Sequence, residues 1–64
     1  MVRVNGVDLD VAGKTVREYL AKTKYDSRRI AVERNGEIVV KSQYDVTVLE
    51  EGDSLEIVSF VGGG

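Results

Sequence analysis

Two Asn-Gly dipeptides, Asn5-Gly6 and Asn35-Gly36, each stand between short segments in which apolar and polar residues alternate. A two-residue type I′ turn needs positive φ at both central residues, and Asn followed by Gly is the pair that adopts this most readily. Alternation with a period of two is typical of a strand with one buried face. Residues 2–11 and 30–40 are therefore each predicted to form a β-hairpin, within a chain of only 64 residues.

Between the two predicted hairpins, residues 15–23 carry the signals of a short helix. Thr15 and Glu18 have the spacing of a capping box, in which each side chain satisfies a backbone N–H of the first turn. One stripe of the segment, at positions i, i+3, i+4 and i+7, is predicted to face the core. Its members are Val16, Tyr19, Leu20 and Thr23. A helix this short has to be stabilised by packing.

The remainder of the chain predicts an anchored loop and two further strands. Residues 41–45 are irregular, and Tyr44 is expected to anchor them from below. Residues 46–49 are predicted to form a short strand, 50–53 a turn, and 54–61 the last strand.

The order of these elements predicts an α+β fold, with one main helix packed on one face of a small mixed sheet. The β-grasp (ubiquitin-like) arrangement is the candidate, although the pattern does not fix the strand order. We expect one domain over residues 1–61, followed by a flexible Gly-Gly-Gly tail at 62–64.

The composition excludes whole classes of function. Cysteine and histidine are both absent, which removes thiol chemistry and every nucleophilic triad that needs either residue. A net charge of −2 argues against nucleic acid as a partner, because nucleic-acid modules present a basic face. The longest apolar run, Ile38 to Val40, is too short for a membrane span or a signal peptide. We therefore expect no membrane partner, and the cytoplasm as the default compartment.

Two segments resemble ligand-binding motifs but lack a required residue. Residues 12–15 (Ala-Gly-Lys-Thr) lie where a phosphate-binding loop would be, but Asp8 stands where that loop needs a glycine. Residues 8–10 resemble the start of a calcium loop, but Tyr19 stands where the bidentate acid belongs. No pair of residues suited to proton transfer is evident either. The chain is therefore not expected to be an enzyme or to hold a metal.

Three consecutive glycines at the end of the sequence carry the clearest functional signal. Because glycine has no Cβ, such a segment passes through a channel too narrow for other residues. Three extended residues span roughly 10 Å, enough for Gly62 and Gly63 to thread a partner's active site. The carboxylate of Gly64 resists nucleophiles until AMP transfer from ATP turns it into a mixed anhydride, which sulfur can attack. The domain would then be the substrate; a frayed end or a truncated linker is the alternative.

The last strand also suggests where a partner docks. If Leu55 and Ile57 point to the core, Val58 and Phe60 lie on the open face of the sheet beside the tail. An exposed apolar pair next to the reactive end is typical of a docking patch. The alternative is that Val58 and Phe60 pack against neighbouring strands or against the loop at 41–45.

The chain as a whole resembles the ThiS family, the ubiquitin-like sulfur carriers of thiamine biosynthesis. The resemblance rests on the order of several segments and covers the whole length. They are Asn5-Gly6, residues 15–20, 31–39, 42–44 and 51–64. Two positions depart from the family pattern: Val40 stands where proline is common, and Gly62 adds a glycine to the two that the family needs.

The resemblance implies a β-grasp fold and a chemistry centred on Gly64. A ThiF-like adenylyltransferase, using ATP and magnesium, would adenylate its carboxylate. Sulfur from a persulfide enzyme would then give a C-terminal thiocarboxylate, and a ThiG-like thiazole synthase would receive the sulfur. The chain itself would bind no cofactor.

Two other hypotheses stay open from the sequence. One is a carrier for another pathway, such as a MoaD-like small subunit of molybdopterin synthase. The other is a ubiquitin-like interaction domain with an inert tail.

Overall fold

Both Asn-Gly turns form, and each joins an antiparallel pair of strands. The computed structural model describes residues 1–60. Strands β1 (Val2–Val4) and β2 (Val7–Leu9) form the first hairpin, and β3 (Ile30–Arg34) and β4 (Glu37–Val39) the second. Asn5 and Asn35 have φ values of 49° and 52°, as a type I′ turn requires. Both predicted hairpins are confirmed, although the strands are shorter than the alternating segments.

Helix α1 (Val16–Ala21) begins at the predicted capping box. The Glu18 backbone N–H donates to Thr15 Oγ1 at 3.1 Å, and the Thr15 backbone N–H donates to Glu18 Oε1 at 2.8 Å. The helix is shorter than the predicted stripe: Thr23 lies beyond its end, where its hydroxyl donates to the Leu20 carbonyl oxygen. The first turn is thus fixed by local hydrogen bonds, and packing stabilises the rest.

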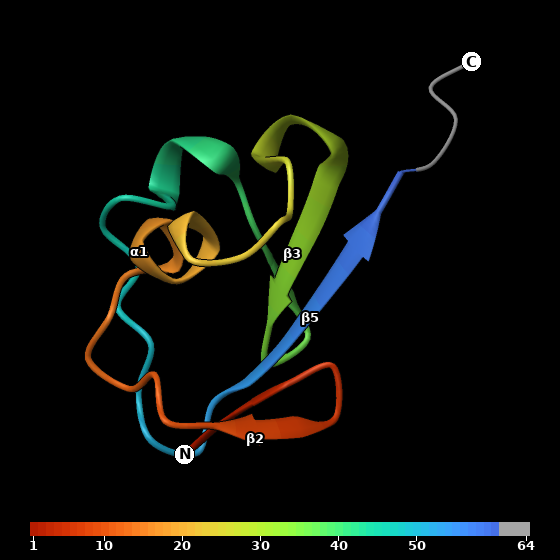
Figure 1. Ribbon diagram of the computed structural model, residues 1–64. Coiled ribbons are helices and arrows are strands. Elements are labelled where there is room, and N and C mark those ends of the chain that lie inside the picture. Colours follow the sequence, from red (N-terminus) through yellow and green to blue (C-terminus); the bar gives the residue numbers. More distant parts are fainter. Residues whose placement is uncertain (61–64) are drawn as a thin grey trace.

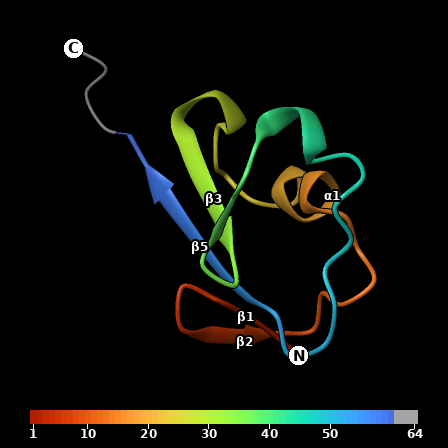
Figure 2. The same cartoon turned by 180° about the vertical axis from the view of Figure 1, so that it is seen from behind.

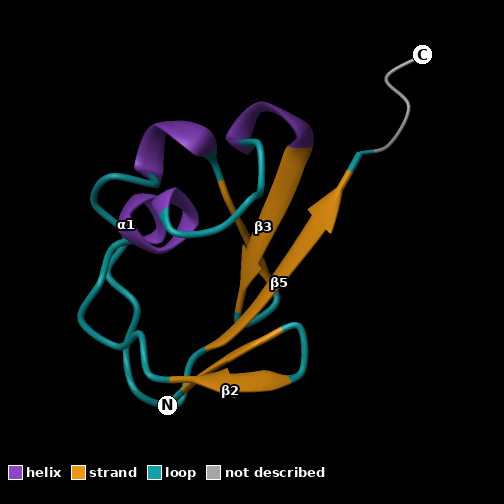
Figure 3. Cartoon of the chain, viewed as in Figure 1, coloured by secondary structure: helices purple, strands orange, loops and turns teal. Residues whose placement is uncertain are grey.

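Strand β5 (Ser54–Ser59) is the last strand of the described residues and the central one in the sheet. The order is β2-β1-β5-β3-β4, with β5 parallel to β1 and antiparallel to β3. Helix α1 lies on one side of this sheet (Figure 1), and the view from behind shows β1 and β2 beside the lower end of β5 (Figure 2). Figure 3 shows that a large part of the chain between β4 and β5 is loop.

The core lies between α1 and the sheet. Its buried residues come from β1, α1, β3, β5 and the loop before β5. They are Val2, Val4, Val16, Leu20, Ile30, Val32, Tyr44, Leu49, Leu55 and Ile57. Tyr44 is only 4% exposed, which confirms it as the anchor of its loop.

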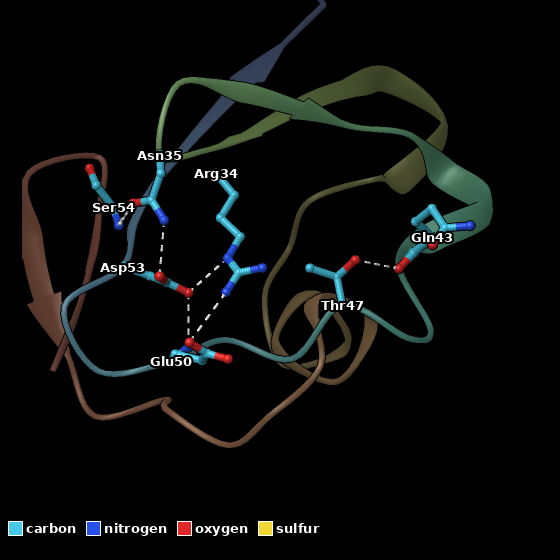
Figure 4. Close-up of polar contacts among 7 residues, drawn as sticks. All are labelled: Arg34, Asn35, Gln43, Thr47, Glu50, Asp53 and Ser54. Atoms are coloured by element: carbon cyan, nitrogen blue, oxygen red, sulfur yellow. Dashed lines mark hydrogen bonds and ion pairs between the residues drawn. The ribbon is translucent and has the colours of Figure 1, made fainter.

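The predicted strand at 46–49 is wrong. Val48 forms only an isolated bridge with Thr15, and no strand is assigned there. The reason is that the preceding residue, Thr47, bonds to a turn instead of to a strand. Its hydroxyl donates to the Gln43 carbonyl oxygen at 2.7 Å (Figure 4). Farther on, the Leu49 N–H donates to the Lys14 carbonyl oxygen, so this segment pairs with the loop before α1.

Two short 3₁₀ turns lie outside the helix and the strands, and the second falls in the segment predicted as irregular. Ser27–Arg29 begins at Asp26, whose side chain accepts a hydrogen bond from the Arg28 N–H. That bond is the largest of the effects that lower the pKa of Asp26, followed by its hydrogen bond from the Arg28 side chain. Lys41–Gln43 precedes the anchor Tyr44. Both turns join elements of the core without adding a strand.

Asp53 is the one buried charged residue in the described part of the chain, and it ties β3 to the turn before β5 (Figure 4). Its carboxylate accepts hydrogen bonds from Arg34 Nε at 2.8 Å and from Asn35 Nδ2 at 3.0 Å. The Glu50 backbone N–H donates to it at 2.8 Å. Burial by itself raises the pKa of Asp53, but these hydrogen bonds and the Arg34 charge outweigh it and leave the pKa below its ordinary value.

The unfolding free energy is expected to depend on the charge of Asp53. Because the folded-state pKa is lowered, its contribution is present above the unfolded value of about 3.9 and is lost as the pH falls through the folded value. We expect Asp53→Asn to cost about 1–3 kcal/mol at neutral pH and to flatten the loss of stability below about pH 5.

Urea unfolding of the wild type and Asp53→Asn at several pH values measures this contribution. Asp10→Asn removes an exposed carboxylate and controls for the change in net charge. Parallel pH profiles for the wild type and Asp53→Asn would exclude the proposed role of the charge.

Candidate functional site

The end of β5 is where the candidate site begins. The Phe60 N–H donates to the Arg29 carbonyl oxygen at 2.7 Å, one residue after the strand ends at Ser59. Figures 1 and 2 both show the carboxyl end of β5 pointing away from α1. The predicted tail residues Gly62, Gly63 and Gly64, and Val61 before them, lie outside the described residues, so their roles stay predictions.

The two predicted docking residues lie on the open face, which is the face of the sheet turned away from α1. Val58 is 55% exposed and Phe60 is 58% exposed. On the same strand Leu55 and Ile57 are buried in the core, as the alternation predicts. The orientation of the last strand is therefore confirmed, and the docking role itself stays a hypothesis.

The structure adds one apolar residue to this face, Ile38, and leaves Val40, just after β4, exposed as well. Both are exposed, Ile38 by 69%, whereas Val39 between them packs against the core. Because Ile38 pairs with Glu33 of β3, it lies two strands from β5 on the open face. The alternation at Ile38 and Val39 indicates that they face opposite sides, but only the strand order places Ile38 relative to β5.

Side chains from the two Asn-Gly turns hold β5 in place. Asn5 Oδ1 accepts a hydrogen bond from the Ile57 N–H at 2.8 Å, and Asn5 Nδ2 donates to the Ile57 carbonyl oxygen at 3.2 Å. Asn35 Oδ1 accepts from the Ser54 N–H at 2.9 Å. The two asparagines thus replace ladder hydrogen bonds along the strand that presents Val58 and Phe60.

A small cavity lies on the helix side of the molecule, away from the open face. Its volume is about 180 Å³, below the roughly 300–1,000 Å³ of typical ligand pockets. Its lining is Arg17, Leu20, Ala21, Tyr25, Ser27 and Tyr44. Arg17 forms an ion pair with Asp45, and burial raises the pKa of Tyr44 further from neutrality. Neither group is therefore poised for acid–base catalysis at neutral pH.

The two near-motifs of the sequence have structural roles. The Gly13 N–H, which a phosphate would need, donates to the Leu49 carbonyl oxygen at 2.8 Å. Asp8 accepts a hydrogen bond from Arg3 Nε at 3.1 Å. Over residues 1–60, no three acidic, histidine or cysteine side chains are grouped so that they could hold a metal ion. The described helices also include none long and apolar enough to cross a bilayer.

Comparisons with known proteins agree on one family. The model of the ThiS family matches residues 2–64. The sulfur carrier protein ThiS of Bacillus subtilis is 38% identical over 66 residues, covering all of both chains. The crystal structure of the thiamine biosynthesis protein ThiS from Geobacter metallireducens aligns with a TM-score of 0.78 at 34% identity, covering 98% of this chain and 97% of the other. This likeness confirms the β-grasp expectation.

A second kind of relative is much longer. A thiazole synthase of Paramagnetospirillum magneticum is 48% identical over 62 residues, which are 95% of this chain and 19% of that protein. The chain therefore spans about a fifth of the length of this relative.

Proposed function

Because this chain belongs to the ThiS family, we propose that Gly64 is the residue through which it carries sulfur. The protein is a sulfur carrier of thiamine biosynthesis, and it is a cosubstrate of enzymes without being a catalyst itself. The observation that supports the role of Gly64 is the family match itself, which extends through the three glycines to residue 64.

The proposed reaction has two stages at the Gly64 carboxyl group. A ThiF-like adenylyltransferase, using ATP and magnesium, transfers AMP to the carboxylate and releases pyrophosphate. The terminal sulfur of an enzyme persulfide then attacks the acyl carbon, and AMP leaves. A thiol cleaves the resulting S–S bond, which leaves the thiocarboxylate on the carrier and a disulfide on the donor side. Since ATP is available in the cytoplasm, we propose that compartment for the reaction.

Thiazole synthase is the sulfur acceptor that we propose. Two relatives called thiazole synthase contain a segment similar to this chain within a longer polypeptide. A carrier and the enzyme that consumes its sulfur gain from being joined, because linkage raises the effective concentration of one at the other. That arrangement in the relatives favours direct delivery from this carrier to a ThiG-like enzyme.

The mass of the intact protein tests the proposed chemistry. The carrier is incubated with a ThiF-like adenylyltransferase, ATP, magnesium and a persulfide donor, and its mass is measured before and after. We expect a product in which one oxygen is replaced by sulfur, confined by fragmentation to Gly64. An unchanged mass, with an enzyme that converts another carrier under the same conditions, would contradict the proposal.

We further propose that Val58 and Phe60 contact the activating enzyme. A tail made only of glycine offers a partner no side chains, so the affinity has to come from the body of the domain. Both residues are exposed and lie at the end of β5 nearest the tail. Aromatic residues at the centre of an interface commonly account for much of its binding energy.

Phe60→Ala is expected to weaken binding to the activating enzyme by about tenfold or more, which is the loss typical of an aromatic interface residue. Because Phe60 is 58% exposed, the free energy of unfolding of the variant should differ from that of the wild type by no more than about 0.5 kcal/mol. Calorimetric titration and thermal unfolding measure the two effects. Val46→Ala, at an exposed valine outside the assigned strands, is the matched control. Unchanged affinity combined with loss of folding would reject the docking role.

A further inference from the structure

Asn5 contacts β5 twice, once with its backbone and once with its side chain. In the described residues, β1 pairs with β5 only as far as Val4 and Leu55. The Asn5 backbone N–H then donates to the Leu55 carbonyl oxygen at 2.9 Å. The Asn5 side chain continues to Ile57, where Oδ1 accepts from the N–H at 2.8 Å and Nδ2 donates to the carbonyl oxygen at 3.2 Å. Asn5 thus extends the hydrogen bonding of this edge of β5 beyond the end of β1.

The turn at Asn5-Gly6 does not by itself need the side-chain amide of Asn5. Its φ of 49° lies in a region that glycine enters without a steric cost. The amide is held in one orientation, because Nδ2 also donates to the Tyr25 hydroxyl at 3.4 Å and Tyr25 packs against the core. The reverse orientation would place Oδ1 against the Ile57 carbonyl oxygen, and both atoms are acceptors. The amide therefore has a role besides the turn.

The bonds to Ile57 lie close to the end of β5 that leads to the candidate sulfur site. Ile57 is three residues before Phe60, and Gly64 is four residues after it. Figure 1 shows the carboxyl end of β5 extending beyond the β1–β2 hairpin. The other edge is held from the side of β3, where the Phe60 N–H donates to the Arg29 carbonyl oxygen at 2.7 Å. Without the Asn5 amide, this end of β5 would be hydrogen-bonded on one edge only among the described residues.

We propose that Asn5 is a positioning residue for the reaction at Gly64, because its bonds to Ile57 fix the direction in which β5 presents the end of the chain. The inference rests on the proposed function. A carrier whose β5 end samples several directions binds productively only in the fraction that points correctly, and its apparent affinity falls by that fraction. Loss of the amide should therefore raise the KM of the carrier. The kcat should not change, because every productively bound carrier has the same geometry.

Asn5→Gly keeps the turn and removes the amide. The KM of the carrier for the ThiF-like adenylyltransferase, from initial rates of pyrophosphate release, should rise about tenfold with kcat unchanged, as expected for the loss of two ordinary hydrogen bonds. In the free protein, hydrogen exchange at the Phe60 backbone amide should accelerate about tenfold as well, because that end of β5 opens locally more often. The bond that protects this amide is the one to the Arg29 carbonyl oxygen.

Asn35→Gly is the matched control, since it makes the same change in the other Asn-Gly turn, where φ is 52°. The Asn35 side chain bonds to the Ser54 N–H and to Asp53, at the amino end of β5. This variant should lower the thermal midpoint at least as much as Asn5→Gly and leave both KM and exchange at Phe60 unchanged. An equal rise of KM in both variants would show that KM follows overall stability, which would overturn the proposal.

The two measurements on Asn5→Gly also have to agree. Faster exchange with an unchanged KM would overturn the proposal, because opening of the strand end would then have no effect on the reaction. A raised KM with unchanged exchange would overturn it too, since Asn5 would then contact the enzyme directly instead of acting through β5.

Asn5→Asp provides the test if the glycine variant does not fold. Aspartate tolerates positive φ and keeps an oxygen that can accept from the Ile57 N–H, but it has no donor for the carbonyl oxygen. With one of the two hydrogen bonds lost, KM should rise about threefold. A wild-type KM in this variant would contradict the positioning role.

The wild type controls for the proposed chemistry. If it gains the thiocarboxylate while Asn5→Gly has a wild-type KM, the positioning role fails and the proposed function stands. If the wild type releases no pyrophosphate with an enzyme that is active on another carrier, the proposed function fails. Hydrogen exchange at Phe60 then still decides whether Asn5 holds the end of β5.

Discussion

Deletion of Gly63 and Gly64 is expected to abolish thiocarboxylate formation and to leave the folded domain as stable as before. The two residues span about 7 Å when extended, so the shortened terminus stops that far from the position at which AMP is transferred. In-line transfer depends on placement of the reacting atoms to within about an ångström, so the loss should be complete within detection.

The stability of the folded domain should not change, because the last core residue is Ile57 and β5 ends at Ser59. Intact mass after incubation with enzyme, ATP and sulfur donor gives the first readout, and the thermal midpoint gives the second. Replacement of both glycines by alanine keeps the length and tests whether the missing side chain matters as well. Sulfur incorporation into the truncated chain would show that Gly64 is not the site.

Leu55→Ala is expected to have the largest effect on stability. Leu55 is 1% exposed and sits in the central strand, opposite Val4 of β1 and Arg34 of β3. Truncation of a buried leucine costs about 2–5 kcal/mol. A chain of 64 residues has a total stability of roughly 3–10 kcal/mol, so the variant should lose a large part of it.

Thermal unfolding should show a midpoint lower by roughly 10 °C or more, because 1 kcal/mol corresponds to about 4–8 °C in a domain of this size. Val58→Ala is the matched control on the same strand, since Val58 is 55% exposed. It should keep the midpoint and weaken docking, the reverse of Leu55→Ala. Equal losses of stability in both variants would contradict the assignment of the two faces of β5.

Local signals predicted the elements whose hydrogen bonds are local. The turn at Asn5-Gly6 and the cap at Thr15 depend on residues within a few positions, and both form as expected. The strand predicted at 46–49 does not form, because its backbone N–H groups donate to the carbonyl oxygens of Gln43 and Lys14. The alternation of apolar and polar residues does not indicate these partners. The central position of β5 could likewise not be predicted from the alternation of residues, since it depends on pairing of β5 with β1, at the other end of the chain.

The candidate site likewise has a part that could be predicted from the sequence and a part that could not. Exposure of Val58 and Phe60 followed from the period of a strand, and it is confirmed. Placing Ile38 on the same face, two strands away from β5, needed the strand order. The position of Ile38 relative to Val58 could therefore not be predicted from the sequence, although the alternation at Ile38 indicates an ordinary strand residue.

The central position of β5 has a consequence for biosynthesis. Among residues 1–60 the two hairpins share no backbone pairing with each other, and β5 bridges β1 and β3. Because β5 follows both hairpins in the sequence, the growing polypeptide cannot complete its sheet until β5 has been synthesised. A chain whose synthesis stops before β5 would lack both the bridge between its hairpins and the strand that carries Val58.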